Sequence, residues 1–190
     1  MRALILRTAI CLLGLLPAGG ARADEVSVEA TRRGDALEVV CKAMLDAPLD
    51  LIWQTLTDYG RLAEFIPGMR SSRVVGQRGA TFIVEQSGVA TFLFVSTPIE
   101  VTLASTEHPP YAIEVSMIKG NLKRLDGAYR IEPQGGRRML LTWTGIVEAQ
   151  SMVPLLGEMV MRSNIEDQFR GMVREIERRD ALRPEREAGK

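Results

Sequence analysis

The sequence contains very few of the side chains that carry metal and nucleophilic chemistry. Its 190 residues include one histidine, His108, and two cysteines, Cys11 and Cys41. A zinc site needs several His, Cys or carboxylate ligands at suitable spacing, and a nucleophilic triad needs a histidine base. His108 stands beside two prolines in "TEHPPY", which is typical of an exposed loop. We therefore expect no metal, no cofactor and no catalytic residues, although acid–base chemistry by carboxylates stays open.

Clusters of basic residues are also missing, and this argues against nucleic acid as a partner. The chain has 24 basic and 24 acidic residues, and its first 23 positions hold three of the basic ones and none of the acidic ones. The remainder therefore carries a formal net charge of −3. Phosphate binding depends on Lys and Arg gathered on one face, and no such gathering is seen.

The longest apolar run is too short to span a membrane and lies at the N-terminus. Arg2 and Arg7 precede an apolar run that ends at Leu16, and small residues lead up to Ala23. This arrangement is typical of a secretory signal, and a spanning helix needs roughly 20 apolar residues. We expect a signal peptide over residues 1–23, cleavage near Ala23-Asp24, and a periplasmic or secreted protein. The alternative is retention of the segment as an anchor.

One cysteine would remain after cleavage. An oxidising compartment favours cysteines in pairs, so the lone Cys41 is expected to be a small buried apolar side chain.

Residues 24–68 predict a hairpin followed by two short helices. "RRGD" supplies a turn between two alternating runs. The apolar face of the second run comprises Val39, Cys41, Ala43 and Leu45. Pro48 begins a helix that Gly60 ends, and "RLAEFIPG" gives a second helix before Gly68. Because such short helices are not stable alone, we interpret them as a lid over a cavity, hinged at Gly60 and Pro67-Gly68.

Residues 69–150 predict a meander of antiparallel strands, since the turn signals "QRG", "TP", "EHPP", "KGN" and "QGG" leave no room for helices between them. A long helix begins near Pro154, and the chain becomes charged after Arg178. An antiparallel sheet with one apolar face needs a cover. We therefore expect one α+β domain over residues 24–180: a curled antiparallel sheet of about 6–7 strands around the C-terminal helix. Residues 181–190 are expected to form a disordered tail.

This order of elements and four short motifs resemble the START-like helix-grip (SRPBCC) superfamily, within it the polyketide cyclase/dehydrase and coenzyme Q-binding branch. The motifs are Pro48–Trp53, Asp58-Tyr59, Phe65-Ile66-Pro67 and Ser71–Val74. The resemblance covers nearly the whole chain after the signal and implies a helix-grip fold that binds a hydrophobic molecule or lipid. It is more specific for fold than for function. Gly68, where quinone-binding members tend to place a bulky aromatic, and the export signal argue against ubiquinone itself.

Apolar side chains that strand alternation and helical spacing place on inner faces are the candidates for a cavity lining. They are Trp53, Tyr59, Phe65, Phe92, Phe94, Tyr111, Met117, Tyr129, Trp143 and Met159. The alternative, equally weighted, is that these side chains pack a solid core.

Three charged residues are candidates for a polar end of that cavity. Glu85 lies mid-strand beside Gln86, which is a candidate of the same kind, and Arg162 and Glu166 are four residues apart on the last helix. The apolar sector in which this helical pair falls is defined by Leu155, Met159, Phe169 and Val173. The alternative is that both charged groups reach water.

Three functional hypotheses follow from these observations. The first is a non-catalytic carrier or sensor of a hydrophobic small molecule or lipid, with transient contact to a membrane. The second is a cyclase or dehydratase in which cavity carboxylates, or Tyr111 and Tyr129, serve as acid and base. The third is a membrane- or protein-interaction module with a filled core.

Overall fold

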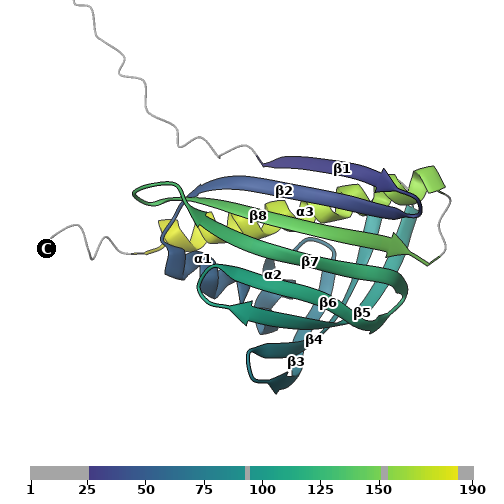
Figure 1. Ribbon diagram of the computed structural model, residues 1–190, viewed down its shortest axis with the longest axis horizontal. Coiled ribbons are helices and arrows are strands. Elements are labelled where there is room, and N and C mark those ends of the chain that lie inside the picture. Colours follow the sequence, from purple (N-terminus) through teal and green to yellow (C-terminus); the bar gives the residue numbers. More distant parts are fainter. Residues whose placement is uncertain (1–25, 93–94, 151–153, 184–190) are drawn as a thin grey trace, which may run out of the picture.

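The computed structural model describes residues 26–92, 95–150 and 154–183. The predicted signal peptide and cleavage site, Phe94 and most of the predicted tail lie outside these ranges. The described residues form one eight-stranded antiparallel sheet that curls around a long C-terminal helix (Figure 1). The α+β helix-grip fold is thereby confirmed.

The strands are β1 (Ser27–Arg33), β2 (Ala36–Asp46), β3 (Met69–Arg78), β4 (Thr81–Phe92), β5 (Val95–His108), β6 (Ala112–Gly120), β7 (Leu122–Pro133) and β8 (Arg138–Ala149). The helices are α1 (Leu49–Leu56), the 3₁₀ turn η1 (Tyr59–Arg61), α2 (Leu62–Phe65) and α3 (Pro154–Ala181). The sheet order is β1-β2-β8-β7-β6-β5-β4-β3, so β3 to β8 form a meander and the N-terminal hairpin is added beside β8. The sheet therefore has eight strands, including the predicted hairpin, where about 6–7 were expected.

The N-terminal hairpin follows directly from its sequence. Gly34 adopts a left-handed φ of 63° at the turn, a conformation that glycine takes without steric cost. Beyond it, period-two alternation points one face of β2 at the core. The four predicted apolar positions of that face, Val39, Cys41, Ala43 and Leu45, are all at most 1% exposed.

One predicted turn is misplaced. The sequence "TP" at Thr97-Pro98 was expected to separate two strands, but Pro98 lies within β5 and pairs with Val89 of β4. On its other side, β5 pairs with β6 only from Val101 onward. Pro98 therefore stands where β5 has one neighbour, and a missing N–H is tolerated at such an edge position.

The C-terminal helix α3 fills the curl of the sheet. Phe169, Val173 and Ile176 are at most 4% exposed, and α3 contacts β1, β2, β4 and β8 as well as α1 and α2. In Figure 1, α1 lies close to the C-terminal end of α3. Within the described part of the chain, the helices lack the combination of length and apolar character that crossing a membrane requires.

Residues 49–66, which contain α1, η1 and α2, are called the cap segment below. Pro48 stands at the N-cap of α1 with a φ of −64°, the angle that suits a helix start. The buried face of α1 consists of Leu51, Ile52, Thr55 and Leu56. Two short predicted helices are thus found, with a 3₁₀ turn between them.

Candidate functional site

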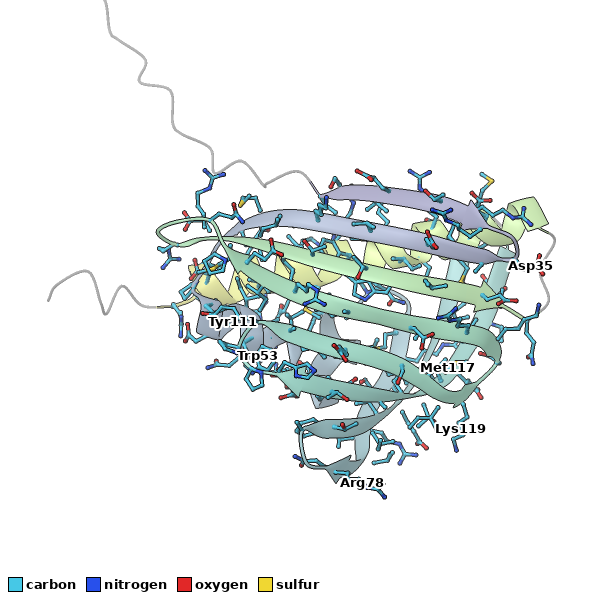
Figure 2. The ribbon with its side chains drawn as sticks, in the orientation of Figure 1. Asp35, Trp53, Arg78, Tyr111, Met117 and Lys119 are labelled. Carbon is cyan, nitrogen blue, oxygen red and sulfur yellow. The ribbon has the colours of Figure 1, made fainter. Side chains whose placement is uncertain are left out.

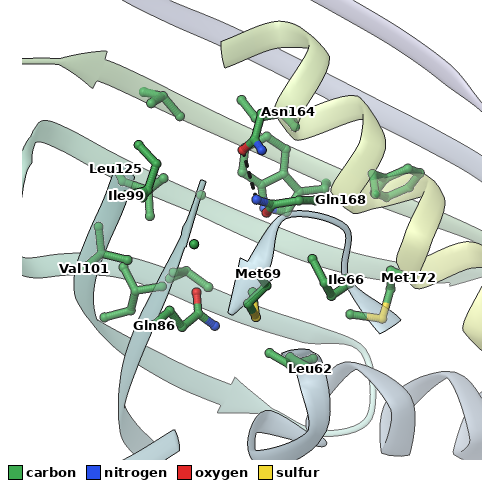
Figure 3. Close-up of a pocket in the computed structure, with 18 of the residues that line it drawn as sticks. Leu62, Ile66, Met69, Gln86, Ile99, Val101, Leu125, Asn164, Gln168 and Met172 are labelled. Carbon is green, nitrogen blue, oxygen red and sulfur yellow. Dashed lines mark hydrogen bonds between the residues drawn. The ribbon is translucent and has the colours of Figure 1, made fainter. Parts of the chain in front are cut away.

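A partly enclosed cavity of about 180 Å³ lies between the inner face of the sheet, α3 and the cap segment (Figure 3). Its wall is mainly aliphatic and includes Leu56, Leu62, Ile66, Met69, Val89, Ile99, Val101, Leu103, Ile113, Val115, Leu122, Leu125, Val147, Met161, Ile165, Phe169 and Met172. An apolar cavity of about 150 Å³ in another protein stays dry and takes up benzene. The volume here therefore suits about one substituted aromatic ring.

Three of the ten predicted lining residues are found in the wall: Tyr59, Tyr129 and Trp143. The Tyr129 and Trp143 rings are neighbours, with centroids 6.4 Å apart. Their strands are adjacent, because β7 and β8 pair Tyr129 with Trp143 directly. Alternation along the strands therefore places both rings on the face that lines the cavity.

The Trp143 indole has room because two glycines lie beneath it. Gly127 and Gly145 face each other across β7 and β8. A Cβ atom at Gly145 would overlap the indole, and one at Gly127 would stand 3.2 Å from it and 2.7 Å from the Thr144 carbonyl oxygen. The two glycines therefore leave the space that the Trp143 ring occupies in the cavity wall.

Most of the other predicted lining residues lie outside the cavity. Trp53, Phe65 and Met117 are half-buried and pack against the core without lining the cavity. Tyr111 precedes β6 and is 49% exposed, so strand alternation does not govern its direction (Figure 2). Met159 is 42% exposed. The side chain of Phe92, like Phe94, is outside the described part of the structure.

The prediction failed on α3 because its helical phase was set one residue off. The cavity face consists of Met161, Asn164, Ile165, Gln168, Phe169 and Met172, which follow the spacing i, i+3, i+4, i+7, i+8, i+11 of one helix face. Arg162 is therefore turned to solvent. Glu166 lies beside the face and accepts a hydrogen bond from Arg170 Nη2 at 2.8 Å.

The polar groups that do reach the cavity are mostly uncharged. Gln168 Nε2 donates to Asn164 Oδ1 at 2.9 Å (Figure 3). Gln86 lines the wall, whereas Glu85 pairs with Arg73 at 2.6 Å and is absent from the lining. Alternation separates these two neighbours, so of the two candidates Gln86 lies in the cavity wall and Glu85 does not. A helical wheel centred on Met161 would have identified Asn164 and Gln168.

Tyr59 is a wall residue whose hydroxyl oxygen is fully shielded. Its side chain is 7% exposed and lines the cavity, and its ring stands 5.6 Å from that of Phe82. Burial, and then the charge of nearby Glu107, raise the pKa of Tyr59 well above its ordinary value. Burial likewise raises the pKa of Tyr129. Both phenols therefore stay protonated near neutral pH and are poor general bases.

Cys41 lies in the core and has no reactive character. It is 0% exposed, and burial raises the pKa of its thiol to about 12. A thiol that stays protonated is inert toward oxidants and metals, which agrees with the expectation of a small buried apolar side chain. Among residues 26–92, 95–150 and 154–183, no group of three or more His, Cys, Asp or Glu side chains is placed to hold a metal ion.

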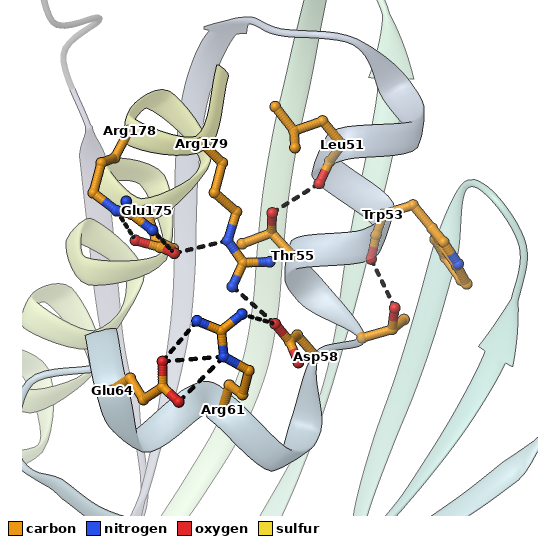
Figure 4. Close-up of polar contacts among 10 residues, drawn as sticks. Leu51, Trp53, Thr55, Asp58, Arg61, Glu64, Glu175, Arg178 and Arg179 are labelled. Atoms are coloured by element: carbon orange, nitrogen blue, oxygen red, sulfur yellow. Dashed lines mark hydrogen bonds and ion pairs between the residues drawn. The ribbon is translucent and has the colours of Figure 1, made fainter. Parts of the chain in front are cut away.

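The cap segment is fastened to α3 by charged groups (Figure 4). Arg179 Nη2 donates to Asp58 Oδ2 at 2.8 Å, and Arg179 Nε donates to Glu175 Oε1 at 2.7 Å. The same guanidinium lies 5.3 Å from the ring centroid of Phe65. Arg178 supplies a second partner for Glu175. One arginine thus joins the first half of the cap segment, its second half and the helix.

Backbone contacts fasten the other end of the cap segment. Gly68 adopts a φ of 76°, and its carbonyl oxygen accepts a hydrogen bond from Val89 N at 2.8 Å. Gly171 lets α3 approach the cap segment closely, since a Cβ there would stand 2.9 Å from the Phe65 carbonyl oxygen and overlap Pro67. Gly60 has neither a left-handed φ nor a crowded Cβ position. Motion about the predicted hinges stays a prediction.

The family of the chain is decided by a family model that covers most of this fold. Residues 45–177 match the model described as "Polyketide cyclase / dehydrase and lipid transport". The chain belongs to this family. The match runs from the end of β2 to the last turns of α3, and so includes the cap segment, the meander and the cavity face of the helix.

Several solved structures have the same fold as this family member, although their sequences are only distantly similar to it. The Zhui aromatase/cyclase from Streptomyces sp. R1128 is 16% identical, with a TM-score of 0.67 over 76% of this chain and 95% of that one. A STAR-related lipid transfer protein from Xanthomonas axonopodis is 12% identical, with a TM-score of 0.65 over 84% of this chain and 97% of that one. A START superfamily protein from Mycobacterium smegmatis is 14% identical, with a TM-score of 0.63 over 74% of this chain and 97% of that one. No curated protein matches the chain.

Proposed function

We propose that this is an exported, periplasmic or secreted protein that binds a hydrophobic small molecule or lipid in the cavity between sheet and α3, without catalysis. The observation that carries the proposal is the apolar cavity of about 180 Å³, which the surrounding side chains leave open. The family description includes lipid transport. The N-terminal residues 1–23 support export, because they have the charge, apolar run and small-residue ending of a secretory signal.

The driving force for binding is burial of apolar surface. A ring-sized ligand that loses about 200 Å² of accessible area gains about 5 kcal/mol before the costs of association. We expect dissociation constants of about 1 mM for simple aromatic probes, since 1 mM corresponds to about 4 kcal/mol and the costs of association reduce the gain of about 5 kcal/mol. A larger lipid would need the cap segment or the side chains of α3 to move aside.

Binding without catalysis is supported by the state of the ionisable groups at the cavity. Tyr59 and Tyr129 are held protonated by burial. Asp126, the acidic side chain in the wall, accepts a hydrogen bond from Arg124 Nε at 2.6 Å. The Tyr111 and Tyr129 acid–base pair of the cyclase hypothesis is not assembled, because Tyr111 is exposed outside the cavity. An interaction module with a filled core is disfavoured by the cavity itself.

Protein purified from the periplasm tests this proposal. Native mass spectrometry, followed by organic extraction, should reveal a co-purifying apolar molecule on a chain that begins at Asp24. Calorimetric titration with ethylbenzene should then show saturable binding to protein from which that molecule has been removed. Empty protein that fails to bind ethylbenzene would refute the proposal, and turnover of a polyketide-like substrate would favour the cyclase instead.

A matched pair of variants locates the binding site. Leu125→Trp places an indole in the cavity wall, whereas Ile118→Trp places the same side chain on an exposed position of β6. We expect Leu125→Trp to abolish ethylbenzene binding and Ile118→Trp to leave it unchanged, with both variants folded by circular dichroism. Equal binding by the two variants would place the ligand elsewhere.

A further inference from the structure

Strand β1 is an open edge of the sheet. It stands at one end of the strand order and pairs with β2 alone, and Figure 1 shows it as the outermost strand. Five of its seven residues are exposed, and it pairs with β2 without a register shift. The free backbone groups of such a regular edge are a template for pairing with another strand.

The opposite edge of the sheet, β3, has features that hinder such pairing. Its ladder with β4 is interrupted by register shifts at two places, and irregularities of this kind protect sheet edges. Parts of the cap segment, η1 and α2, lie against it. Its charged residues are Arg70, Arg73 and Arg78, so two copies of β3 would repel each other. Self-association through a sheet edge is therefore expected at β1.

The alternation of hydrogen bonds across the sheet identifies the free backbone groups of β1. At the β7–β8 turn, Gln134 N donates to Arg138 O at 2.8 Å, so the even-numbered residues of β8 bond to β7. The odd-numbered residues of β8 therefore bond to β2, and the even-numbered residues of β2 bond to the odd-numbered residues of β1. Val28, Ala30 and Arg32 consequently direct their N–H and C=O groups away from the sheet.

The two faces of β1 differ in character. Val28 and Ala30 pack against the core, so alternation directs Glu29, Thr31 and Arg33 to the outer face of the curled sheet. The two charged residues have opposite signs and stand equally far from Thr31 along the strand. When two copies of a strand pair about a two-fold axis, residues on the same face lie opposite each other.

We propose that two copies of this chain pair through their β1 strands, antiparallel to each other and about a two-fold axis at Thr31. In this register Glu29 of each copy lies opposite Arg33 of the other, and Ala30 lies opposite Arg32. The two sheets thereby continue into one. The inference concerns an interaction surface remote from the cavity and does not depend on the proposed function.

The charges of the outer face select this register over its neighbours. An axis at Glu29 would place two carboxylates opposite each other. An axis at Ala30 would place Glu29 opposite Thr31, and Arg33 opposite Ser27. The axis at Thr31 forms two pairs of opposite charge, and such cross-strand pairs stabilise a sheet whereas like charges destabilise it.

Both members of the charged pair are available in the single chain. Glu29 is exposed, and its side chain has no hydrogen bond or ion pair within the described structure. Arg33 Nε donates to Glu38 at 3.0 Å, and the Arg33 side chain is 70% exposed. A guanidinium group has five donors, so it can serve a second carboxylate. In this register the pair is of the kind without backbone hydrogen bonds, whose side chains are closest.

The interface is small and fits a weak dimer. Ala30 and Arg32 of the two copies exchange about four backbone hydrogen bonds in this register. Interfaces below the standard size form transient complexes. We expect a dissociation constant of about 0.1 mM for the dimer.

Disulfide cross-linking at the axis tests the register. Thr31→Cys places two thiols opposite each other, at a Cβ separation of about 4.5–5.5 Å that is close to that of a disulfide. Ser27→Cys is the matched control, because Ser27 is exposed on the same face but would stand about 27 Å from its copy. Cys41 is 0% exposed, and Cys11 is replaced by serine in both variants. Thr31→Cys should form a linked dimer at least about tenfold faster.

Charge reversal tests the pairing between the copies. Glu29→Arg and Arg33→Glu each place like charges opposite each other, so each variant alone should weaken the dimer about tenfold or more. An equimolar mixture of the two variants places opposite charges together again, and it should regain the wild-type affinity within about threefold. Glu132→Arg, an exposed position on β7, is the control and should change nothing. Sedimentation velocity measures association, and circular dichroism verifies that each variant is folded.

Three results would overturn the inference. One is a wild-type protein that sediments as a monomer up to about 1 mM, ten times the expected dissociation constant. Another is equal cross-linking at the two cysteine positions. The third is a mixture of the charge variants that associates no better than either variant alone. None of these measurements involves a ligand, so the proposed function stands or falls separately.

Discussion

Replacement of Arg179 by methionine tests how the cap segment is held over the cavity. The change removes two charged hydrogen bonds, to Asp58 at 2.8 Å and to Glu175 at 2.7 Å, and the contact with the Phe65 ring. Arg179 is only 16% exposed in its side chain. A hydrogen bond to a charged group contributes about 1.5–3 kcal/mol, and the cation–π contact about 1 kcal/mol. Since both carboxylates keep another arginine nearby, we expect a net loss of about 2–3 kcal/mol.

The neighbouring arginine provides the matched control. Arg178 also donates to Glu175, at 2.7 Å, but its side chain is 56% exposed and it contacts neither Asp58 nor Phe65 in the described structure. Solvent screens such a pair, so Arg178→Met should destabilise the protein by about half as much as Arg179→Met or less. Urea unfolding of both variants measures the difference, and the thermal midpoint of Arg179→Met should fall by about 4–10 °C. An equal or larger effect of Arg178→Met would show that the bridge to the cap segment contributes little.

Two further predictions concern the same region. Hydrogen bonds from Arg178, and then from Arg179, lower the pKa of Glu175 from 4.5 to about 2. A carboxyl whose pKa is lower in the folded than in the unfolded protein stabilises the fold above pH 5, and this stabilisation is lost as the pH falls toward 2. For Glu175 we expect the free energy of unfolding to fall by about 1–3 kcal/mol over that range. The urea midpoint of wild type should therefore decrease between pH 6 and pH 3. An equal decrease in Glu175→Gln would contradict the role of this carboxyl. Gly171→Ala should destabilise by about 1–3 kcal/mol despite the higher helix propensity of alanine, because its Cβ overlaps the cap segment. Ser163→Ala on the same helix is the control, and a raised thermal midpoint for Gly171→Ala would show that the cap segment gives way freely.

Strand faces could be predicted from the sequence where a run of alternating apolar residues shows which of the two phases faces the core. Val39 and Cys41 were assigned to the core, and both are at most 1% exposed. Tyr129 and Trp143 were likewise placed on one face and meet in the cavity wall. The start of a strand could not be predicted in the same way. Tyr111 was placed on the inner face of a strand, but β6 begins one residue later, so alternation does not apply to Tyr111.

Helix α3 could not be oriented from its sequence alone. Met159, Val160 and Met161 are consecutive apolar residues, so an apolar face that includes Met159 and one that includes Met161 fit the pattern about equally well. Packing against the sheet selects the second face, and this choice exchanges the predicted Arg162 for Asn164. A shift of one residue rotates the helix face by about 100° and so changes which polar side chains enter the cavity. Contacts between distant segments decide it, and local spacing does not.

The position of α3 in the chain also has a consequence for biosynthesis. Every strand of the sheet precedes Pro154 in sequence, so the sheet emerges from the ribosome before the helix that completes the cavity. Until α3 has been synthesised, the apolar inner surface of the sheet is uncovered and can aggregate or bind a chaperone. Under the proposed function, ligand binding therefore follows synthesis of the last helix, and a chain truncated before residue 154 should retain no ligand.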